Sequence, residues 1–120
     1  MSVTAVTESL FCLGLNEALP VSEEATTSRV VVNNDVLRTV IFTFDAGQQL
    51  TEHASPRAVV VTLLEGQMDF SIGERTERMG AGDVIYLAPG DRHALAAVTP
   101  CRMQLVMVDV DNEAVGASQG

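Results

Sequence analysis

The chain of 120 residues is long enough for one domain with a single hydrophobic core and too short for two. Its formal net charge is −9, and its seven basic residues are arginines scattered along the chain. This argues against nucleic-acid binding, because a surface that follows phosphates needs clustered cations. Hydrophobic residues make up 47% of the chain, yet no apolar run reaches the roughly 18 residues of a membrane-spanning helix.

Residues 1–27 carry short apolar islands and a polar loop, and they predict no regular secondary structure. The first residues lack the basic start of a secretory signal, so we expect no targeting segment. Cys12 and Cys101 are too few and too far apart for a disulfide framework or a metal knuckle. We therefore expect two reduced thiols in a cytoplasmic protein.

Residues 28–111 consist of short runs rich in β-branched residues, separated by turn residues, and they predict one β domain. The run 67–72 alternates strictly, with Met68, Phe70 and Ile72 on the inward face. The predicted strands, in chain order, are residues 29–33, 37–44, 58–64, 67–72, 75–79, 84–87, 93–98 and 102–109. The tail 112–120 is expected to be flexible.

Eight to nine short strands without a helical period indicate an all-β fold, either an antiparallel sandwich or a barrel. The chain contains no tryptophan, so it lacks the Cys…Trp…Cys spacing of immunoglobulin domains. A jelly-roll barrel is therefore the favoured architecture. Long apolar strands such as 37–44 need their edges and faces covered, so we expect a homodimer to which the apolar islands of residues 9–19 contribute.

The only two histidines lie in segments with related glycine spacing. Five residues separate Gly47 from His53 in the first segment. In the second, Gly82 precedes Gly90, which two residues separate from His93. The two segments resemble the paired motif of the cupin family of small β-barrels. In that motif, a first half of Gly, five residues and His-x-His is matched by a second half of Gly, five residues, Pro-x-Gly, two residues and His. The resemblance covers roughly residues 40–108.

Three positions depart from that motif. Ser55 stands where the family has its second histidine, Val59 where it has a glutamate, and Ala88 where it has a proline. The resemblance implies an RmlC-like jelly roll in which His53 and His93 line one cavity and hold a divalent metal such as Zn, Fe, Mn or Ni. A site of this kind uses imidazoles plus a carboxylate and leaves positions open for substrate. In this chain the carboxylate is missing.

Strand alternation would place residues 53, 55, 57 and 59 on one face together with Gln49, while Glu52 points the other way. Two imidazoles are fewer ligands than a zinc site normally uses, so Gln49, Thr51 or Gln104 would have to supply another. Beside the two histidines, the predicted pocket comprises Ser55, Val59, Gln49, Val61, Met68, Phe70, Tyr86, Leu95 and Gln104. Its apolar character suits a neutral or weakly anionic small organic molecule.

Three functions remain open at this point. The chain is a binding protein that holds a small organic molecule without turnover, a metal-dependent enzyme of the dioxygenase, isomerase or decarboxylase type, or a structural or interaction module with a filled barrel. The lost glutamate and second histidine favour the first and the third. A barrel cavity below about 100 Å³ would exclude an enclosed organic ligand, because useful ligand sites are several-fold larger.

Overall fold

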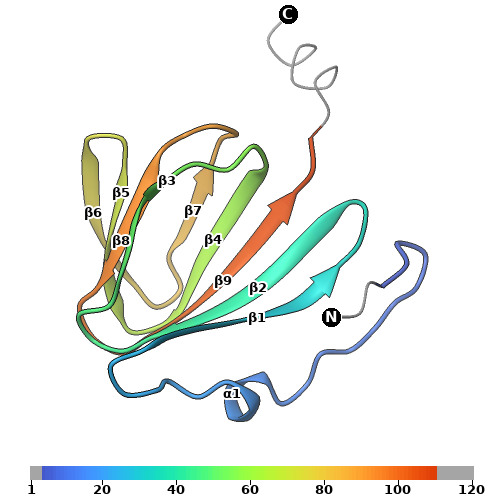
Figure 1. Cartoon of the computed structure of the whole chain (residues 1–120), viewed down its shortest axis with the longest axis horizontal. Coiled ribbons are helices and arrows are strands. Elements are labelled where there is room, and N and C mark those ends of the chain that lie inside the picture. Colours follow the sequence, from blue (N-terminus) through green and yellow to red (C-terminus); the bar gives the residue numbers. More distant parts are fainter. Residues whose placement is uncertain (1–3, 111–120) are drawn as a thin grey trace, which may run out of the picture.

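Figure 1 shows the computed structural model of the protein, which describes residues 4–110 as a barrel of two β-sheets. In this range the elements are α1 (Leu15–Ala18), β1 (Thr26–Asn33), β2 (Leu37–Phe44), β3 (Gln49–His53), β4 (Ala58–Glu65), β5 (Gln67–Ile72), β6 (Arg75–Gly80), β7 (Val84–Leu87), β8 (His93–Ala97) and β9 (Cys101–Val108). The predicted flexible tail, residues 112–120, lies outside the described residues. Between residues 4 and 110, no helix is long and apolar enough to cross a membrane.

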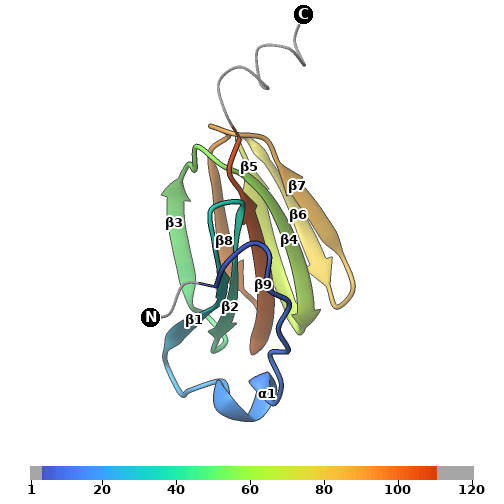
Figure 2. The ribbon, with the colours of Figure 1, turned by 90° about the vertical axis from the view of Figure 1, so that its right-hand side faces the viewer.

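The nine strands of the described chain form two sheets. The five-stranded sheet has the order β1-β2-β9-β4-β7, and the four-stranded sheet has the order β3-β8-β5-β6. All neighbouring strands run antiparallel. Figure 2 shows β3 and β8 on one side of the molecule and β4 and β7 on the other. The predicted all-β jelly roll in a single domain is confirmed.

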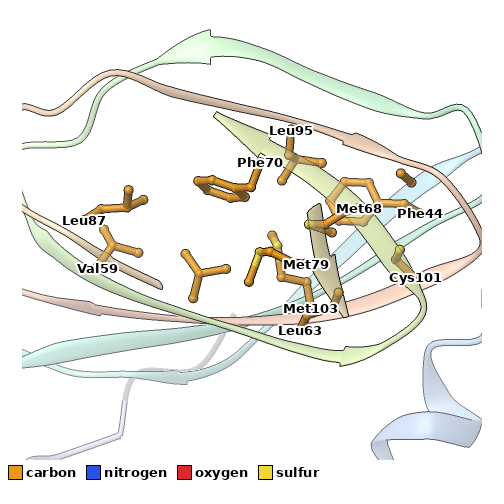
Figure 3. Close-up of a cluster of buried hydrophobic side chains, with 12 residues drawn as sticks. Phe44, Val59, Leu63, Met68, Phe70, Met79, Leu87, Leu95, Cys101 and Met103 are labelled. Atoms are coloured by element: carbon orange, nitrogen blue, oxygen red, sulfur yellow. The ribbon is translucent and has the colours of Figure 1, made fainter. Parts of the chain in front are cut away.

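Side chains from both sheets fill the space between them (Figure 3). Met68 and Phe70 on β5 are buried, as strand alternation predicts, while Asp69 between them forms an ion pair with Arg78. Each fully buried large apolar side chain stabilises the fold by about 1.5–3 kcal/mol. The buried cluster comprises Phe44, Val59, Val61, Leu63, Met68, Phe70, Met79, Leu87, Leu95, Ala97, Cys101 and Met103.

The N-terminal segment, residues 4–25, packs against the five-stranded sheet with little regular structure of its own. The backbone N–H of Thr4 donates to the carbonyl of Asn33 at the end of β1. The guanidinium of Arg102 on β9 donates to the carbonyls of Asn16, within the helical turn α1, and of Leu19, which follows it. In Figures 1 and 2, α1 lies beyond the lower ends of the strands. Sequence periodicity does not report tertiary contacts of this kind. The sequence therefore predicts no regular element in this segment.

Strand β3 carries the irregularity that places the first histidine. Leu50 pairs with Leu95 of β8 and His53 pairs with His93, so three steps along β3 match two steps along β8. The extra residue is a β-bulge, and it lets Leu50 and His53 face the same way despite their odd spacing. The expectation that residues 53, 55, 57 and 59 share one strand face is wrong. β3 ends at His53 and β4 begins at Ala58 in the other sheet.

Candidate functional site

The structure brings the two histidines together. His53, the last residue of β3, and His93, the first residue of β8, are cross-strand partners. Their ring centroids lie 4.2 Å apart with the ring planes inclined by 62°, an edge-to-face contact. Residues forty positions apart in the sequence therefore form one pair of imidazoles at the end of the four-stranded sheet.

The two rings differ in their exposure to solvent. His53 is exposed, whereas only 9% of the surface of His93 is accessible. Burial lowers the pKa of His93 below its ordinary value of 6.5, because the imidazolium form loses its hydration. A hydrogen bond to the carbonyl of Asp91 opposes this effect on the pKa, and the nearby charge of His53 adds to it. His93 is therefore neutral near pH 7 and keeps a nitrogen lone pair.

Both imidazoles are oriented by their own backbone. The Nδ1 atom of His53 lies 2.8 Å from the carbonyl oxygen of Thr51, and the Nδ1 atom of His93 lies 3.2 Å from that of Asp91. Because a carbonyl oxygen only accepts hydrogen bonds, each Nδ1 carries the proton of the neutral ring. Each Nε2 is then left with its lone pair free. Metal-ligating histidines are held in the same way, with the other ring nitrogen donating to a carbonyl or carboxylate.

The ring of Phe70 packs against the buried His93 from inside the barrel. Phe70 of β5 stacks on His93, with ring centroids 6.0 Å apart and planes within 8° of parallel. Phe70 is itself 2% exposed. A stacked aromatic partner restricts rotation of the imidazole about its side-chain bonds, so the ring position is set by packing as well as by the hydrogen bond to Asp91.

The cavity beside the histidine pair is very small. Its volume is about 20 Å³, and apolar side chains including Leu50, Leu87 and Met103 form most of its wall. This is room for one water molecule or one ion. This volume is below about 100 Å³, the size under which an enclosed organic ligand is excluded. It is also far below the roughly 300 Å³ at which pockets for organic ligands begin. An organic ligand enclosed beside the histidines does not fit this barrel.

Three of the predicted pocket residues line this cavity, namely Val61, Phe70 and Leu95. Val59 and Met68 are buried in the core without reaching it. The lining residues that the prediction missed are Leu50, Leu87, Ala94, Met103 and Leu105. Met103 and Leu105 on β9 follow strand alternation, so they could have been predicted from the sequence. Leu50 was not, because the bulge reverses the alternation of β3.

The remaining predicted pocket residues point elsewhere. Leu50 faces the cavity, so Gln49 beside it is exposed. Gln104 lies between two lining residues of β9, and Tyr86 precedes a lining residue of β7, so both face the opposite side of their sheet. Ser55 lies in the loop between β3 and β4, where its Oγ accepts a hydrogen bond of 3.1 Å from the N–H of Arg57.

The two imidazoles have no carboxylate beside them among the described residues. Among residues 4–110, no third histidine, cysteine, aspartate or glutamate gathers with the two imidazoles. Glu52, next to His53, instead forms an exposed ion pair of 3.0 Å with Arg92. Two imidazole nitrogens can bind an ion whose other positions are filled by water, but structural zinc uses four protein ligands and catalytic zinc about three.

Comparisons with known proteins agree with this architecture. Residues 40–110 match the family model described as a cupin domain. A conserved protein of unknown function from Streptococcus pyogenes, SPY1581, has a solved structure that is 32% identical in sequence, with a TM-score of 0.78 over 92% of this chain and 97% of that one. A comparison with proteins of curated function finds no significant match.

More distant structures share the fold alone. An RmlC-like cupin protein from Desulfovibrio desulfuricans is 23% identical, with a TM-score of 0.74 over 83% of this chain and 97% of that one. The DMSP lyase DddQ from Ruegeria pomeroyi is 19% identical, with a TM-score of 0.65 over 72% of this chain and 48% of that one. The family match spans more than half of the sequence, and the two motif histidines meet in the barrel. This chain belongs to the cupin family.

Proposed function

We propose that this cupin is a binding protein whose His53–His93 pair holds one divalent transition-metal ion through the two Nε2 atoms. One observation carries the proposal: the two rings are in contact and both Nδ1 atoms are engaged by backbone carbonyls, which leaves the Nε2 atom of each ring to bind a ligand. The neutral state of His93 near pH 7 supports it, because only an unprotonated imidazole binds a metal.

The ligand set also orders the candidate metals. Imidazole nitrogens suit Zn, Ni and Fe, and affinities rise from Mn²⁺ through Fe²⁺ to Ni²⁺. We therefore expect Ni²⁺ and Zn²⁺ to bind more tightly than Fe²⁺ or Mn²⁺. Because two protein ligands leave several positions to water, an anionic group of a small molecule could complete the site from the exposed side of His53. Binding without turnover is favoured over a metal-dependent enzyme, since the motif carboxylate is replaced by Val59.

The second candidate function is a structural or interaction module with a filled barrel. The cavity of about 20 Å³ favours it, because twelve buried side chains occupy the space that a ligand would need. In this case His93 would act as a packing residue that is stacked on Phe70 and extends the core toward the surface. The two functions differ in a measurable way, since only the first requires the Nε2 atoms.

Ring-nitrogen NMR separates these functions directly. The chain contains only two histidines, so in an untagged ¹⁵N-labelled protein every imidazole signal comes from this pair. Titration with Zn²⁺ should shift the Nε2 resonances of both rings together and saturate at one ion per chain. His53→Ala and His93→Ala should each abolish the response, and Ser55→Ala should leave it unchanged. Unshifted Nε2 resonances at millimolar Zn²⁺ would refute metal binding and favour the filled module.

We also propose that two copies of the chain pair through the N-terminal segment. Phe11 is 90% exposed and Leu13 80% exposed, although large apolar side chains favour burial. Light scattering on the wild-type protein should give twice the mass of one chain. Replacing both residues by serine should give a single-chain mass, whereas Val98→Ser, at a partly exposed position of the barrel, should leave the dimer intact. A wild-type protein with the mass of one chain would refute the pairing.

A further inference from the structure

A second and larger cavity opens at the side of the barrel, away from the histidine pair. β6 is the edge strand of the four-stranded sheet and β7 is the edge strand of the five-stranded sheet. A cavity of about 290 Å³ lies between them, with an apolar floor that includes Phe70, Ile72, Met79 and Ile85. Four charged side chains also line it: Arg75, Glu77, Arg78 and Asp83. We call it the β6–β7 pocket. Phe70 lines both this pocket and the small cavity beside the histidines.

Two charged side chains lie on the inward face of β6 at this opening. Arg75, Glu77 and Met79 alternate along the strand, and Met79 is buried in the core. Their partners on β5 are Ile72, Phe70 and Met68, which are the inward residues of that strand. Arg75 and Glu77 therefore belong to the side of β6 that faces the barrel interior, where the neighbouring strand presents only apolar side chains.

One known role of inward-pointing charges on an edge strand is to prevent that strand from pairing with other chains. At this edge, however, the charges stand over a cavity large enough for a small molecule. Its volume is just below the roughly 300–1,000 Å³ found for pockets that bind drug-sized ligands, which leaves room for a smaller molecule. The combination of an apolar floor with a few polar groups at one side is also the usual chemistry of such pockets.

Arg75 and Arg78, the two arginines of this pocket, differ in how many of their N–H groups already donate hydrogen bonds. Arg78 forms two hydrogen bonds with the carboxylate of Asp69. Arg75 forms one, from Nε to Glu77 at 2.8 Å, and its side chain is 80% exposed. A guanidinium has five N–H donors arranged to bind a carboxylate with two parallel hydrogen bonds. The terminal nitrogens of Arg75 are therefore available for an anionic group lying over the apolar floor.

We propose that the β6–β7 pocket binds a small organic carboxylate, with its apolar body on Phe70 and Ile72 and its carboxylate on the guanidinium of Arg75. The binding is independent of the metal proposed for the histidine pair and should occur in the metal-free protein. The net charge of −9 repels anions at long range, but salt screens exposed charges beyond about 8–10 Å at 0.1–0.15 M. The local contact to Arg75 then decides affinity.

Sodium benzoate and its neutral counterpart benzyl alcohol are suitable probes, because they share a ring and differ in charge. In metal-free protein at 0.15 M NaCl, benzoate should shift the methyl resonances of Ile72, Ile85 and Met79 in a saturable way. Arg75→Gln should weaken benzoate by at least about tenfold, as expected for one charge-assisted contact. The same variant should leave benzyl alcohol binding within about twofold. Glu77→Gln should strengthen benzoate, because it removes a competing acceptor and a like charge.

Arg92→Gln is the matched control, because it removes the same charge from an exposed arginine that does not line the pocket, and it should leave benzoate affinity within about twofold. The replaced side chains are exposed, so the melting temperatures of these variants should stay near that of the wild type. The proposal is overturned if benzoate causes no saturable shift at these methyl groups, or if Arg75→Gln and Arg92→Gln weaken benzoate binding equally. Filling the pocket with Ile85→Trp should block both probes, and unimpaired binding to that variant would place the site elsewhere.

Discussion

The guanidinium group of Arg102 donates a hydrogen bond of 3.0 Å to the backbone carbonyl of Leu19, which lies 83 residues earlier in the chain. The same side chain also donates to the carbonyl of Asn16 and to the carboxylate of Glu65. Only 6% of the Arg102 side chain is exposed, and cations are rarely buried to this extent without partners. One cation thus joins the N-terminal segment to the five-stranded sheet.

Replacing this cation should release the segment. Arg102→Met keeps the apolar stem but leaves two carbonyls unpaired, so we expect a loss of about 2 kcal/mol in the free energy of unfolding. Hydrogen exchange followed by mass spectrometry should show faster exchange confined to residues 4–25. Arg57→Met is the control, because the ion pair of Arg57 with Asp109 is solvent-accessible and is worth less than about 1 kcal/mol. Unchanged exchange in the segment would contradict this role of Arg102.

Two glycines with nearly the same backbone conformation should respond differently to a methyl group. Gly66 has φ of +90° and Gly82 has φ of +94°. A Cβ on Gly66 would lie 2.2 Å from the carbonyl oxygen of Pro100, whereas one on Gly82 meets nothing within 4 Å. Gly82→Ala should cost about 1–2 kcal/mol for the left-handed conformation, and Gly66→Ala at least about 3 kcal/mol. Equilibrium urea denaturation measures both, and equal losses would show that the clash is relieved.

Stability should fall in mild acid because of His93. Its pKa is lowered in the folded protein, so below pH 6.5 the unfolded chain binds the proton more readily than the folded one. The stabilisation is complete above about pH 6.5 and is lost as the pH falls toward the lowered pKa. The difference in melting temperature between wild type and His93→Gln should therefore shrink from pH 7.5 to pH 5. His53→Gln should retain most of the pH dependence of the wild type, and a constant difference for His93→Gln would contradict the shift.

Cys101 should be unreactive in the folded protein. Burial raises the pKa of its thiol, and the single S–H is shared between the carbonyl oxygens of Gln67 and Thr99, each 3.1 Å from Sγ. Because the thiolate is the reactive species, the Cys12→Ser variant should show no free thiol toward Ellman's reagent until it is denatured, and then one. Rapid labelling of the native variant would mean that the β9 end of the barrel opens readily.

The strands with a clear periodic signal could be predicted from the sequence. The predicted bounds 37–44, 67–72 and 84–87 coincide with β2, β5 and β7, because alternating or β-branched runs there are closed by turn residues. β3 was not among the strands named from such runs, since Leu50 is the one aliphatic side chain among its five residues. The turn α1 has no buried residue and depends on contacts with Arg102, which no local pattern reports.

The site was predictable only to the extent that motif spacing determines it. Glycine spacing was enough to join His53 with His93, because Gly47 and Gly90 lie in the turns that lead into β3 and β8, where their N–H groups donate to the carbonyls of Ala97 and Ser55. The wall around them depends on the bulge, which is set by pairing with β8 rather than by the residues of β3. Alternation without the bulge therefore selects Gln49, where the structure presents Leu50. β6 and β7 are consecutive in the sequence, but the pocket between them depends on their being the edge strands of different sheets, which neither segment encodes by itself.

The bulge in β3 also makes the chemistry opposite His93 depend on strand register. Neighbouring strand positions face opposite ways, so a one-residue slip would turn His53 outward and bring the carboxylate of Glu52 to face His93. The sequence thus contains two alternative partners for His93, the imidazole of His53 and the carboxylate of Glu52. The presence or absence of the bulge determines which of them faces His93. A descendant of this chain could exchange a nitrogen donor for an acidic one by shortening or straightening a loop, without substituting either residue.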